Sequence, residues 1–428
     1  MTAPFDDPRA FLAELFHAAV AAADPERALA AHLPAPPRGR AVVVGAGKGA
    51  AQMAAALERL WQGPPLEGAV VTRYGHGCAT RRIEVLEAAH PAPDEAGLAA
   101  SERMFALARG LGPDDLLIAL ICGGGSALLP APPPGLTLED EIAVNRALLN
   151  SGAPIGQMNA LRVCMSRIKG GRLAAAAHPA RVVTLAASDI PGDDPALIAS
   201  GPTIPQRTGR AEALAVARRW RLDLPEAARA WLERGDCEPP QAGDPAFARD
   251  EAHVVASAGL SLEAAAALAE KRGVRAAILS DSIEGEAREA ARVLGAVARE
   301  CALRARPFAP PVALLSGGET SVRVRGKGRG GRNGEFALAL ARELDGLEGV
   351  CALAADTDGI DGAGDNAGAF CDGASWSRLA GAGADPAALL DDNDAWSAFA
   401  RLDDLFVTGP TGVNVNDFRA ILIAPRGG

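Results

Sequence analysis

The sequence lacks the features of several classes of protein. None of its seven cysteines forms a CxxC pair, and its six histidines show no metal-ligand spacing, so neither a zinc site nor a disulfide-based fold is predicted. No apolar run reaches the roughly 18 residues of a membrane-spanning helix, and the first residues lack the basic start and apolar middle of a signal peptide. These absences predict a cytoplasmic protein with reduced thiols and no membrane partner.

Acidic residues outnumber basic ones, and aromatic side chains are scarce. The formal net charge is -10, which argues against a nucleic-acid partner because phosphate backbones select basic surfaces. Aromatic residues make up 4% of the chain, so alanine, valine and leucine must build the core. What the chain does have is length and apolar residues: 428 residues at 49% hydrophobic are enough for two or three domains with cores of their own.

In the first half of the chain, short apolar runs alternate with alanine-rich helical stretches. The strands predicted from these runs are 41–44, 68–72, 83–88, 116–121 and 181–187. Alternation of strand and helix is typical of a largely parallel sheet with helices on its faces. An amphipathic helix that starts after Asp7, with Pro8 in its first turn, is expected to open this first domain.

Residues 234–251 are polar and rich in proline and glycine, and we interpret them as the boundary between two domains. The predicted domains are residues 1–238 and residues 250–428. A second α/β domain, with strands of mixed direction, is expected after the boundary. Its predicted strands are 253–256, 275–280, 312–316, 321–324, 349–354, 405–407 and 420–423.

Two glycine loops follow predicted strands in the first half. In the loop GAGKGA, Gly45 and Gly47 match the G-x-G-x-x-[GA] form of a dinucleotide-binding turn, and Lys48 supplies a point charge for an anionic group. The acid that usually ends the next strand of such a site is missing; Thr72 and Arg73 stand there, which suggests at best a 2′-phosphate. The second loop exposes successive backbone amides that suit a phosphate or a carboxylate; its residues are Gly123, Gly124, Gly125 and Ser126.

A third basic segment and an isolated acid follow. The stretch SRIKGGRLA places Arg167 and Lys169 beside two glycines, which predicts another anion-binding loop. Asp189 follows the predicted strand 181–187. Acids at the carboxyl ends of parallel strands are where α/β enzymes keep metal ligands and general bases, so Asp189 is a candidate for either role. Ser126 lacks the G-x-S-x-G surroundings of an acyl-transfer nucleophile.

The second half contains a strand, a glycine pair, an acid and a basic loop in one short stretch. Gly317 and Gly318 follow the strand 312–316 and allow close approach of the backbone to a ligand, and Glu319 stands where strand ends often place a ligand group. Arginines and a lysine then alternate with glycines up to Arg332. Such a loop favours a polyphosphate, because guanidinium groups and open amides both donate to phosphate oxygens.

Aspartates gather after another apolar strand, at Asp356, Asp358 and Asp361. Their spacing resembles a calcium loop, but the glutamate at the twelfth position is absent. A carboxylate pair for magnesium, or a base for a hydroxyl group, fits this segment better. Asn414 and Asn416 near the C-terminus either orient a substrate or close a loop through Asx turns.

Taken in chain order, these motifs resemble one known family. The stretches that carry the resemblance are GAGKGA, CGGGSAL, SRIKGGRLA, SDIPGDDPALIASGPT, SGGET, GRGGRNGE, DTDGIDG and TGVNVND, between about residues 45 and 417. They are similar to the glycerate 2-kinase family that carries the MOFRL domain. The resemblance implies an α/β fold with an N-terminal Rossmann-like parallel sheet and a C-terminal MOFRL-type domain, with the active site in the cleft between them. It also implies ATP-dependent phosphorylation of D-glycerate at its 2-hydroxyl, which gives 2-phosphoglycerate and ADP.

The residues and the resemblance together give a set of predicted site residues, with ATP and Mg²⁺ as cofactors. The catalytic candidates are Lys48, Asp189, Arg332 and Asp358. The candidates for nucleotide or phosphate binding are Gly45, Gly47, Gly123, Gly124, Gly125, Ser126, Lys169, Gly317 and Gly318. Substrate contacts are predicted at Arg167, Asn414 and Asn416, and metal contacts at Asp189, Glu319 and Asp356. Which acid is the base and which binds the metal stays open at this point.

Other functions remain open from the sequence alone. The chain departs from the family pattern at Cys122, Val163, Cys164, Gly334 and Val413, which points to changed substrate contacts and admits a kinase of another small hydroxy-acid. Some family members are named hydroxypyruvate reductases, so an NAD(P)H-dependent reductase is one alternative. A non-catalytic protein that holds an organic acid or a nucleotide between two domains is another. A homodimer is left open as well.

Overall fold

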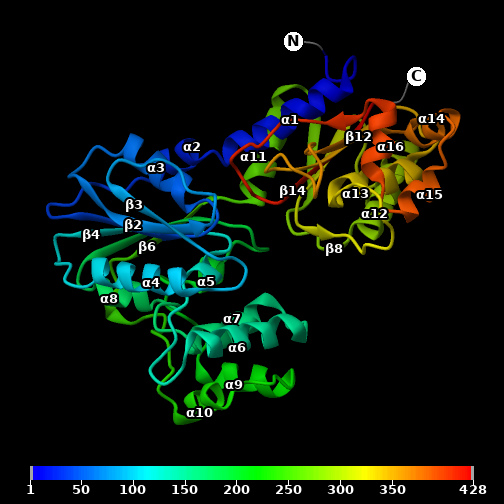
Figure 1. Ribbon diagram of the computed structural model, residues 1–428. Helices are drawn as coiled ribbons and strands as arrows, with labels where there is room; N and C mark the ends of the chain where they lie inside the picture. The colour runs from blue at the N-terminus through cyan, green and yellow to red at the C-terminus, as the bar shows by residue number, and fades with distance from the viewer. Residues whose placement is uncertain (1–2, 426–428) are drawn as a thin grey trace. The chain divides into compact units, whose positions relative to one another are not determined.

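The computed structural model describes residues 3–425, and the chain divides into two compact units (Figure 1). One unit consists of residues 25–255, and we name it the parallel-sheet unit. The other consists of the chain up to residue 24 and from residue 256 onward, and we name it the mixed-sheet unit. Each unit has its own six-stranded sheet with helices packed on it. The predicted α/β architecture with two sheets is confirmed.

The parallel-sheet unit is built on strands that are buried on both faces, as their continuous apolar runs indicate. The strands lie in the order β3-β2-β1-β4-β5-β6. Their bounds are β1 Ala41–Ala46, β2 Leu66–Arg73, β3 Ile83–Ala88, β4 Leu116–Cys122, β5 Arg181–Ala187 and β6 Glu251–Ala256. The pairings from β3 to β5 are parallel, and the order of the chain reverses between β1 and β4. The carboxyl ends of strands at such a reversal are where open α/β sheets bind ligands.

Helices cover both faces of this sheet (Figure 1). The helices α2 and α3 lie on one face, and α4 and α8 lie on the other. Further helices, α6, α7, α9 and α10, pack around a separate small core that includes Leu148, Leu161 and Leu232. The bounds are α2 Pro25–Ala30, α3 Ala50–Leu60, α4 Glu95–Ala108, α5 Gly125–Leu128, α6 Leu138–Ser151, α7 Ile155–Cys164, α8 Arg172–Ala177, α9 Arg210–Arg219 and α10 Glu226–Arg234, with the 3-10 turns η1 Ile198–Ser200 and η2 Pro245–Phe247.

The mixed-sheet unit has strands of both directions, in the order β13-β12-β11-β14-β9-β7. Their bounds are β7 Arg275–Ser280, β9 Val312–Ser316, β11 Val350–Asp356, β12 Gly368–Asp372, β13 Leu405–Phe406 and β14 Asp417–Ile423. The strand β14 pairs antiparallel with both β9 and β11, and β7 pairs parallel with β9. The ends of β9 and β11 and the start of β14 therefore lie at the same end of the sheet.

Two layers of helices enclose the mixed sheet. On one face, α1 and α11 pack through Phe11, Phe16 and Leu262, and on the other face α12 and α13 pack through Leu294 and Leu340. A short pair of strands, β8 and β10, stands apart from the main sheet. The bounds are α1 Pro8–Ala22, α11 Ala258–Lys271, α12 Ala287–Arg304, α13 Arg332–Leu344, α14 Ser375–Gly381, α15 Pro386–Asp391, α16 Ala395–Leu402, β8 Gly285–Glu286 and β10 Thr320–Ser321.

Some elements differ from the sequence analysis. The helix expected to open the first domain is α1, and it packs in the mixed-sheet unit because its apolar face meets α11 and the second sheet. The strand expected at 253–256 in the second domain is β6, at the edge of the first sheet. The strand β12 is missing from the prediction, and the expected strand 321–324 is reduced to β10. Within residues 3–425, none of the helices is both long and apolar enough to cross a membrane.

Candidate active site

The reversal of strand order in the parallel-sheet unit brings the two predicted glycine loops together. The Lys48 N–H donates to Gly123 O at 2.8 Å and joins the loop after β1 to the loop after β4. Gly47 has a φ of 135°, and a Cβ there would overlap the backbone of Cys122. A Cβ at Gly123 would overlap the carboxylate of Asp189, which follows β5. Lys48, Asp189 and both loops therefore lie at one site.

The other glycines of these loops have packing reasons for their presence. A Cβ at Gly45, inside β1, would come within 2.6 Å of Leu120 O. Gly125 packs against Ala199 in the same way. Gly124 has a φ of 80° and forms the N-cap of α5, where it is only half-buried. The role of these glycines in nucleotide or phosphate binding stays a prediction.

Ser126 is an anchor of the second glycine loop. Its Oγ lies 2.7 Å from Ser200 Oγ, which in turn donates to Asn159 Oδ1 at 2.9 Å. Ser200 is buried at a φ of 59°, a strained conformation that persists only where the surrounding structure holds it. These bonds tie α5 to η1 and α7. Strain of this kind concentrates at functional sites, which agrees with the position of the loop at the strand reversal.

Two predicted anion-binding cations already have protein partners. Lys169 is buried, and its Nζ donates to Glu141 Oε1 at 2.7 Å. Arg167 donates from Nε to Pro132 O at 2.9 Å and also pairs with Glu102. Because both charged groups already have these partners, the proposed site does not include Lys169 or Arg167.

In the mixed-sheet unit, Arg332 meets three carboxylates at the ends of three strands. Its Nε donates to Asp417 Oδ1 at 2.6 Å and its Nη2 donates to Asp356 Oδ2 at 2.6 Å. Its Nη1 donates to Glu319 Oε1 at 2.9 Å. Arg332 is the first residue of α13, while the acids begin β14, end β11 and follow β9. Charge-assisted bonds in three directions fix the plane of the guanidinium group.

Asp417 is absent from the predicted site residues, yet it makes the most contacts with the residues around Arg332. Its Oδ1 also accepts from Asn333 Nδ2 at 2.8 Å. Its Oδ2 accepts from the Thr320 N–H at 3.1 Å and from the guanidinium of Arg419. Asp417 is therefore a buried carboxylate that positions Arg332 from a rigid strand. The sequence signal that could have identified Asp417 is an acid at the start of the last apolar strand.

The pKa values of this cluster reflect burial and paired charges. Burial lowers the pKa of Arg332, but the carboxylates of Asp417 and Asp356 raise it well above its usual value, so the side chain stays charged. Burial raises the pKa of Asp356 to about 8; the charge of Arg332 opposes this rise and the charge of Asp358 adds to it. Perturbed carboxylates beside a fixed cation are typical of functional sites.

Asp361 holds the helix that carries Arg332. Its Oδ1 accepts from the Asn333 N–H at 2.9 Å and its Oδ2 accepts from the Gly334 N–H at 2.7 Å. These amides belong to the first turn of α13, where no partner exists within the helix. Burial raises the pKa of Asp361 to about 6, although the two N–H groups lower it. The last aspartate of DTDGID thus caps a helix.

The remaining predicted residues of the aspartate and asparagine loops have local hydrogen bonds. Asp358 is half-buried, and its Oδ1 accepts from the Ile360 N–H at 2.8 Å. Asn414 is exposed, and its Oδ1 accepts from the Asn416 N–H at 3.1 Å, which is the geometry of an Asx turn. The catalytic role of Asp358 and the substrate contacts of both asparagines stay predictions.

The glycine pair after β9 allows two backbone segments to lie close together. The Gly317 N–H donates to Ser280 O at 2.8 Å, so this amide already has a partner. Gly318 has a φ of 104°, and a Cβ there would overlap the backbone of Ile283. The pair therefore lets the segment after β7 pass beside β9. The proposed site therefore does not include Gly317 and Gly318 as phosphate ligands.

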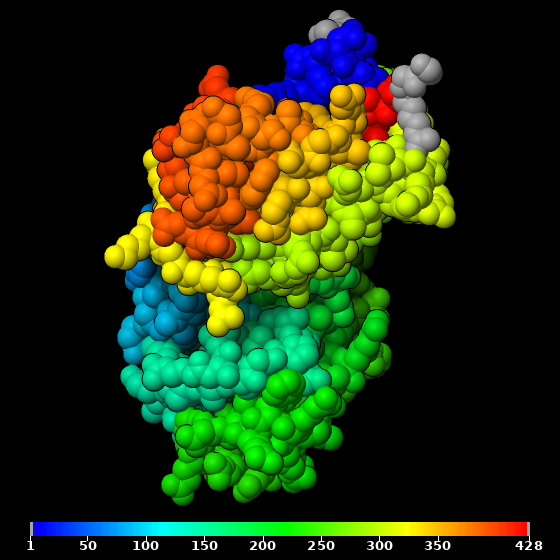
Figure 2. Space-filling model, turned by 90° about the vertical axis from the view of Figure 1, so that its right-hand side faces the viewer, coloured from blue at the N-terminus to red at the C-terminus, as the bar shows by residue number. Residues whose placement is uncertain are grey.

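The basic loop at 325–331 is fixed along the segment between α15 and α16. Figure 2 shows this part of the chain, in yellow, bordering the orange surface of those helices. The Arg325 N–H donates to Asn393 Oδ1 at 2.7 Å, and the guanidinium of Arg329 lies 3.8 Å from the ring centre of Trp396. Backbone amides that the sequence offers to a polyphosphate are thus used to hold the loop in place.

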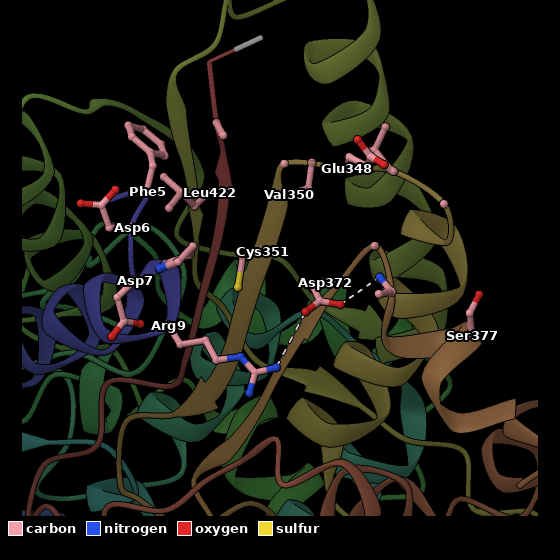
Figure 3. A pocket seen from close by; sticks show the side chains of 17 residues that line it. Phe5, Asp6, Asp7, Arg9, Glu348, Val350, Cys351, Asp372, Ser377 and Leu422 are labelled. Carbon is pink, nitrogen blue, oxygen red and sulfur yellow. Dashed lines mark hydrogen bonds and ion pairs between the residues drawn. The ribbon is translucent and has the colours of Figure 1, made fainter. Parts of the chain in front are cut away.

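A cavity of about 680 Å³ in the mixed-sheet unit lies apart from these residues (Figure 3). It is lined by the start of the chain around Phe5, the start of β11 and the segment after β12. Arg9 in its wall pairs with Asp404 at 2.6 Å and with Asp372 at 3.8 Å, so its charges are matched internally. None of the predicted site residues is among the described residues that line it.

Comparison with known proteins identifies two family regions. The family described as "Domain of unknown function (DUF4147)" matches residues 11–233, and the MOFRL family matches residues 312–417. The first match includes Lys48 and Asp189. The second includes Arg332 and the carboxylates that hold it.

Relatives match the chain over nearly its full length. A protein of Agrobacterium vitis that is provisionally named hydroxypyruvate reductase is 52% identical over 97% of this chain and 94% of its own length. The D-glycerate 2-kinase of Thermotoga maritima is 38% identical over 94% of this chain and 95% of its own length. The crystal structure of a glycerate kinase from Thermotoga maritima has a TM-score of 0.89 and 36% identity, and the match covers 98% of this chain and 100% of that chain. The chain therefore belongs to the glycerate 2-kinase family, in which a DUF4147 region is followed by a MOFRL domain.

Proposed function

We propose that this protein is an ATP-dependent kinase that phosphorylates D-glycerate at its 2-hydroxyl and gives 2-phosphoglycerate and ADP. The observation that carries the proposal is the strand reversal of the parallel-sheet unit, where Lys48, Asp189 and two glycine loops come together. The similarity to the D-glycerate 2-kinase of Thermotoga maritima along nearly the whole chain supports it. A cation, glycine backbone that a ligand can approach closely and an acid are groups that suit phosphoryl transfer.

We assign the roles residue by residue. Phosphoryl transfer asks for little covalent chemistry, so positioning and charge stabilisation dominate. Lys48, at the opening of α3, supplies a point charge for the transferred phosphoryl group. Arg332, held in one plane by its carboxylates, stabilises charge on the phosphoryl oxygens. Asp189 or Asp358 accepts the proton of the 2-hydroxyl.

Magnesium is proposed to arrive with the nucleotide. The predicted ligands Glu319 and Asp356 both bind Arg332, and Asp189 belongs to the other unit. Within residues 3–425, no group of three or more histidine, cysteine, aspartate or glutamate side chains is placed to hold a metal ion. In phosphate-transferring enzymes Mg²⁺ is usually bound by one or two carboxylates plus substrate phosphates, so the proposal needs no cage of protein ligands.

The second candidate function is an NAD(P)H-dependent hydroxypyruvate reductase, which the name of the 52% identical relative favours. The loop after β1 has the glycine spacing of a dinucleotide site. However, Arg73 ends β2, where an NAD site holds the ribose hydroxyl with an acid, so this position is compatible only with the 2′-phosphate of NADPH. In a reductase, Arg332 would serve only to hold the carboxylate of hydroxypyruvate. The kinase accounts for the cations of both units, so we prefer it.

Two parallel assays test the proposal. The full chain is incubated with D-glycerate, ATP and Mg²⁺, and the product is identified as 2-phosphoglycerate or 3-phosphoglycerate. In parallel, NADH and NADPH oxidation is followed with hydroxypyruvate. Formation of 2-phosphoglycerate without oxidation of either cofactor is the expected result. Reduction of hydroxypyruvate without any phosphorylated product would overturn the kinase.

Substrate identity and assembly belong to the same proposal. Val163 and Cys164, which depart from the family pattern, are both buried, and Cys164 belongs to the small core around α7, so their change alters packing and gives no direct reason for a different acid. A kinase of another small hydroxy-acid would use the same groups, and a panel of such acids decides between them. The cytoplasmic location, the absence of a nucleic-acid partner, the homodimer and the functional domains at 1–238 and 250–428 stay predictions.

A further inference from the structure

A basic cluster of Lys48, Arg73 and His90 lies beside the glycine loops, and the roles proposed above leave most of it unused. Arg73 ends β2, which neighbours β1 in the parallel sheet, and its partner in β3 is Ala88. His90 follows two residues later. A Cβ at Gly124 would lie 3.0 Å from His90 Nε2 and 3.3 Å from Lys48 Cγ. The imidazole and the lysine stem therefore cover the same glycine.

Polar atoms in and around this cluster lack protein partners. Within residues 3–425, Arg73 Nε is buried and has no hydrogen-bond partner. The same holds for Oε1 of Gln52, on the neighbouring helix α3, while its Nε2 donates to His76 O at 3.2 Å. Buried polar atoms in native proteins nearly always have a partner, and leaving one unpaired costs free energy. Arg73 Nε is a donor, so an acceptor from outside the protein would complete its bond, whereas Gln52 Oε1 is itself an acceptor and needs a donor.

The charges around His90 are a second indication that a ligand belongs at this cluster. Burial lowers the pKa of His90, and the positive charges of Lys48 and Arg73 lower it further, so the ring is neutral at physiological pH. A neutral imidazole still donates one hydrogen bond. Arg73 also lowers the pKa of His76, after burial, although Glu87 opposes this. The cluster thus combines two cations that repel each other with an N–H donor at the carboxyl ends of parallel strands.

We propose that Arg73, His90 and Lys48 form an oxyanion subsite that holds a carboxylate or a phosphoryl group of a reactant. The planar guanidinium of Arg73 binds two oxygens of either group at once, which a lysine cannot do. An anion at this place gives Arg73 Nε its missing acceptor and offsets the repulsion between the two cations. The subsite explains why an arginine stands where a dinucleotide site would keep an acid.

The identity of the reactant rests on the proposed function, whereas the anion subsite itself does not. Two reactants of the proposed reaction carry an oxyanion: D-glycerate has a carboxylate, and ATP has phosphates. The chemistry that recognises them is shared, so the experiment has one arm for each. Direct binding of D-glycerate and of inorganic phosphate is measured in addition to turnover, so that the subsite can be judged even if D-glycerate is no substrate.

The experiment uses Arg73→Gln in the full chain, with Arg82→Gln as the matched control. Arg82 is exposed and precedes β3. Calorimetry at constant ionic strength gives the Kd of D-glycerate and of inorganic phosphate, and steady-state kinetics give KM for D-glycerate, KM for ATP and kcat. We expect Arg73→Gln to weaken one of the two anions by about tenfold or more, as for a lost charge-assisted hydrogen bond, with a smaller change in kcat. Arg82→Gln keeps wild-type values.

The pattern of loss identifies the ligand. A rise confined to the D-glycerate constants assigns the subsite to the carboxylate, and a rise confined to ATP and inorganic phosphate assigns it to a phosphoryl group. Wild-type constants for both anions in a folded Arg73→Gln protein overturn the subsite while leaving the kinase intact. If Arg73→Gln does not fold, Arg73→Lys and His90→Gln replace it, and wild-type binding in both has the same meaning.

Discussion

Two arginines among the candidate site residues, one in each unit, have opposite surroundings. In the mixed-sheet unit, Arg332 is held by three carboxylates, whereas in the parallel-sheet unit Arg73 has a buried Nε that no described residue satisfies. Paired charges attract each other and fix the geometry of the group. Unpaired charges keep their binding capacity for a ligand but destabilise the folded chain. The orientation of Arg332 is therefore set in advance, whereas a ligand completes the contacts of Arg73.

This difference also separates positioning from binding. Asp417 and Asp356 contact the guanidinium of Arg332 and are both buried, so they act by holding it. The cluster around Lys48 instead stands over glycine backbone, where a ligand can approach closely. Loss of the charge of Arg332 should therefore lower the stability of the mixed-sheet unit, whereas loss of the charge of Lys48 should not lower that of the parallel-sheet unit.

The largest effect is expected from Arg332→Ala. The change leaves Asp417 and Asp356 buried without their shared cation. We expect the free energy of unfolding to fall by on the order of 3 kcal/mol and the rate of phosphoryl transfer to fall by about a hundredfold or more. Urea unfolding and the rate of 2-phosphoglycerate formation measure the two effects.

Lys48→Ala in the parallel-sheet unit is the counterpart of this change. It removes a cation from a cluster of like charges, so the rate should fall strongly while the free energy of unfolding stays at the wild-type value or rises. A wild-type free energy of unfolding for Arg332→Ala would show that its carboxylates do not depend on it. The contrast between the two units would then be wrong.

A smaller effect is expected from Asp417→Asn, which keeps the size of the side chain but removes its charge. Arg332 then loses one of its three anchors and Arg419 loses its closest carboxylate. Because Asp417 acts through the orientation of Arg332, kcat should fall by about tenfold while KM for D-glycerate changes little. Steady-state kinetics separate the two constants.

The control for this variant is Asp403→Asn in the same unit. Asp403 is exposed at a φ of 57°, a conformation that asparagine also adopts readily. It should leave kcat and KM unchanged. An equal rise of KM in Asp417→Asn, with kcat preserved, would mean that Asp417 contributes to substrate binding and does not position Arg332.

Much of the fold could be predicted because a buried strand shows in the sequence as a short run of apolar residues. The runs at 116–121 and 312–316 are continuous and apolar, and they became β4 and β9. The sequence has no such local signal for the element against which a helix or strand packs. The apolar face of α1 shows that the helix packs on something, but the choice of α11 and the second sheet depends on tertiary contacts. The strand β6 was assigned to the second domain for the same reason.

The candidate site shows the same division. Glycine loops and their cation are visible because their chemistry lies within a few residues of sequence. Lys169 looks like a phosphate ligand until Glu141, 28 residues away, is seen beside it. Asp417 contacts Arg332 across 85 residues of chain, so its positioning role has no spacing signature. Burial of a charged group and the identity of its partner are properties of the folded chain alone.

The smallest effect, and the one that depends on pH, is expected at Asp361, the cap of the helix that carries Arg332. Its folded-state pKa is raised to about 6, so its contribution to stability is largest at low pH and declines as the pH rises from about 4 through 6. Asp361→Asn cannot titrate, and it also loses one of two acceptors for the amides of α13, at a cost of about 1 kcal/mol.

Urea unfolding of wild type and Asp361→Asn at about pH 4 and about pH 7 measures both the pH-dependent contribution of the carboxyl and the cost of the lost acceptor. The wild-type advantage should shrink from the lower to the higher pH, because only the wild-type carboxyl gives up a proton in that interval. Asp385→Asn, at the exposed cap of α15, controls for capping without deep burial. An advantage that grows with pH would mean that the N–H groups of Asn333 and Gly334 outweigh burial and hold the carboxylate ionised. Asp361 would then be an ionised cap whose charge the amides of α13 stabilise.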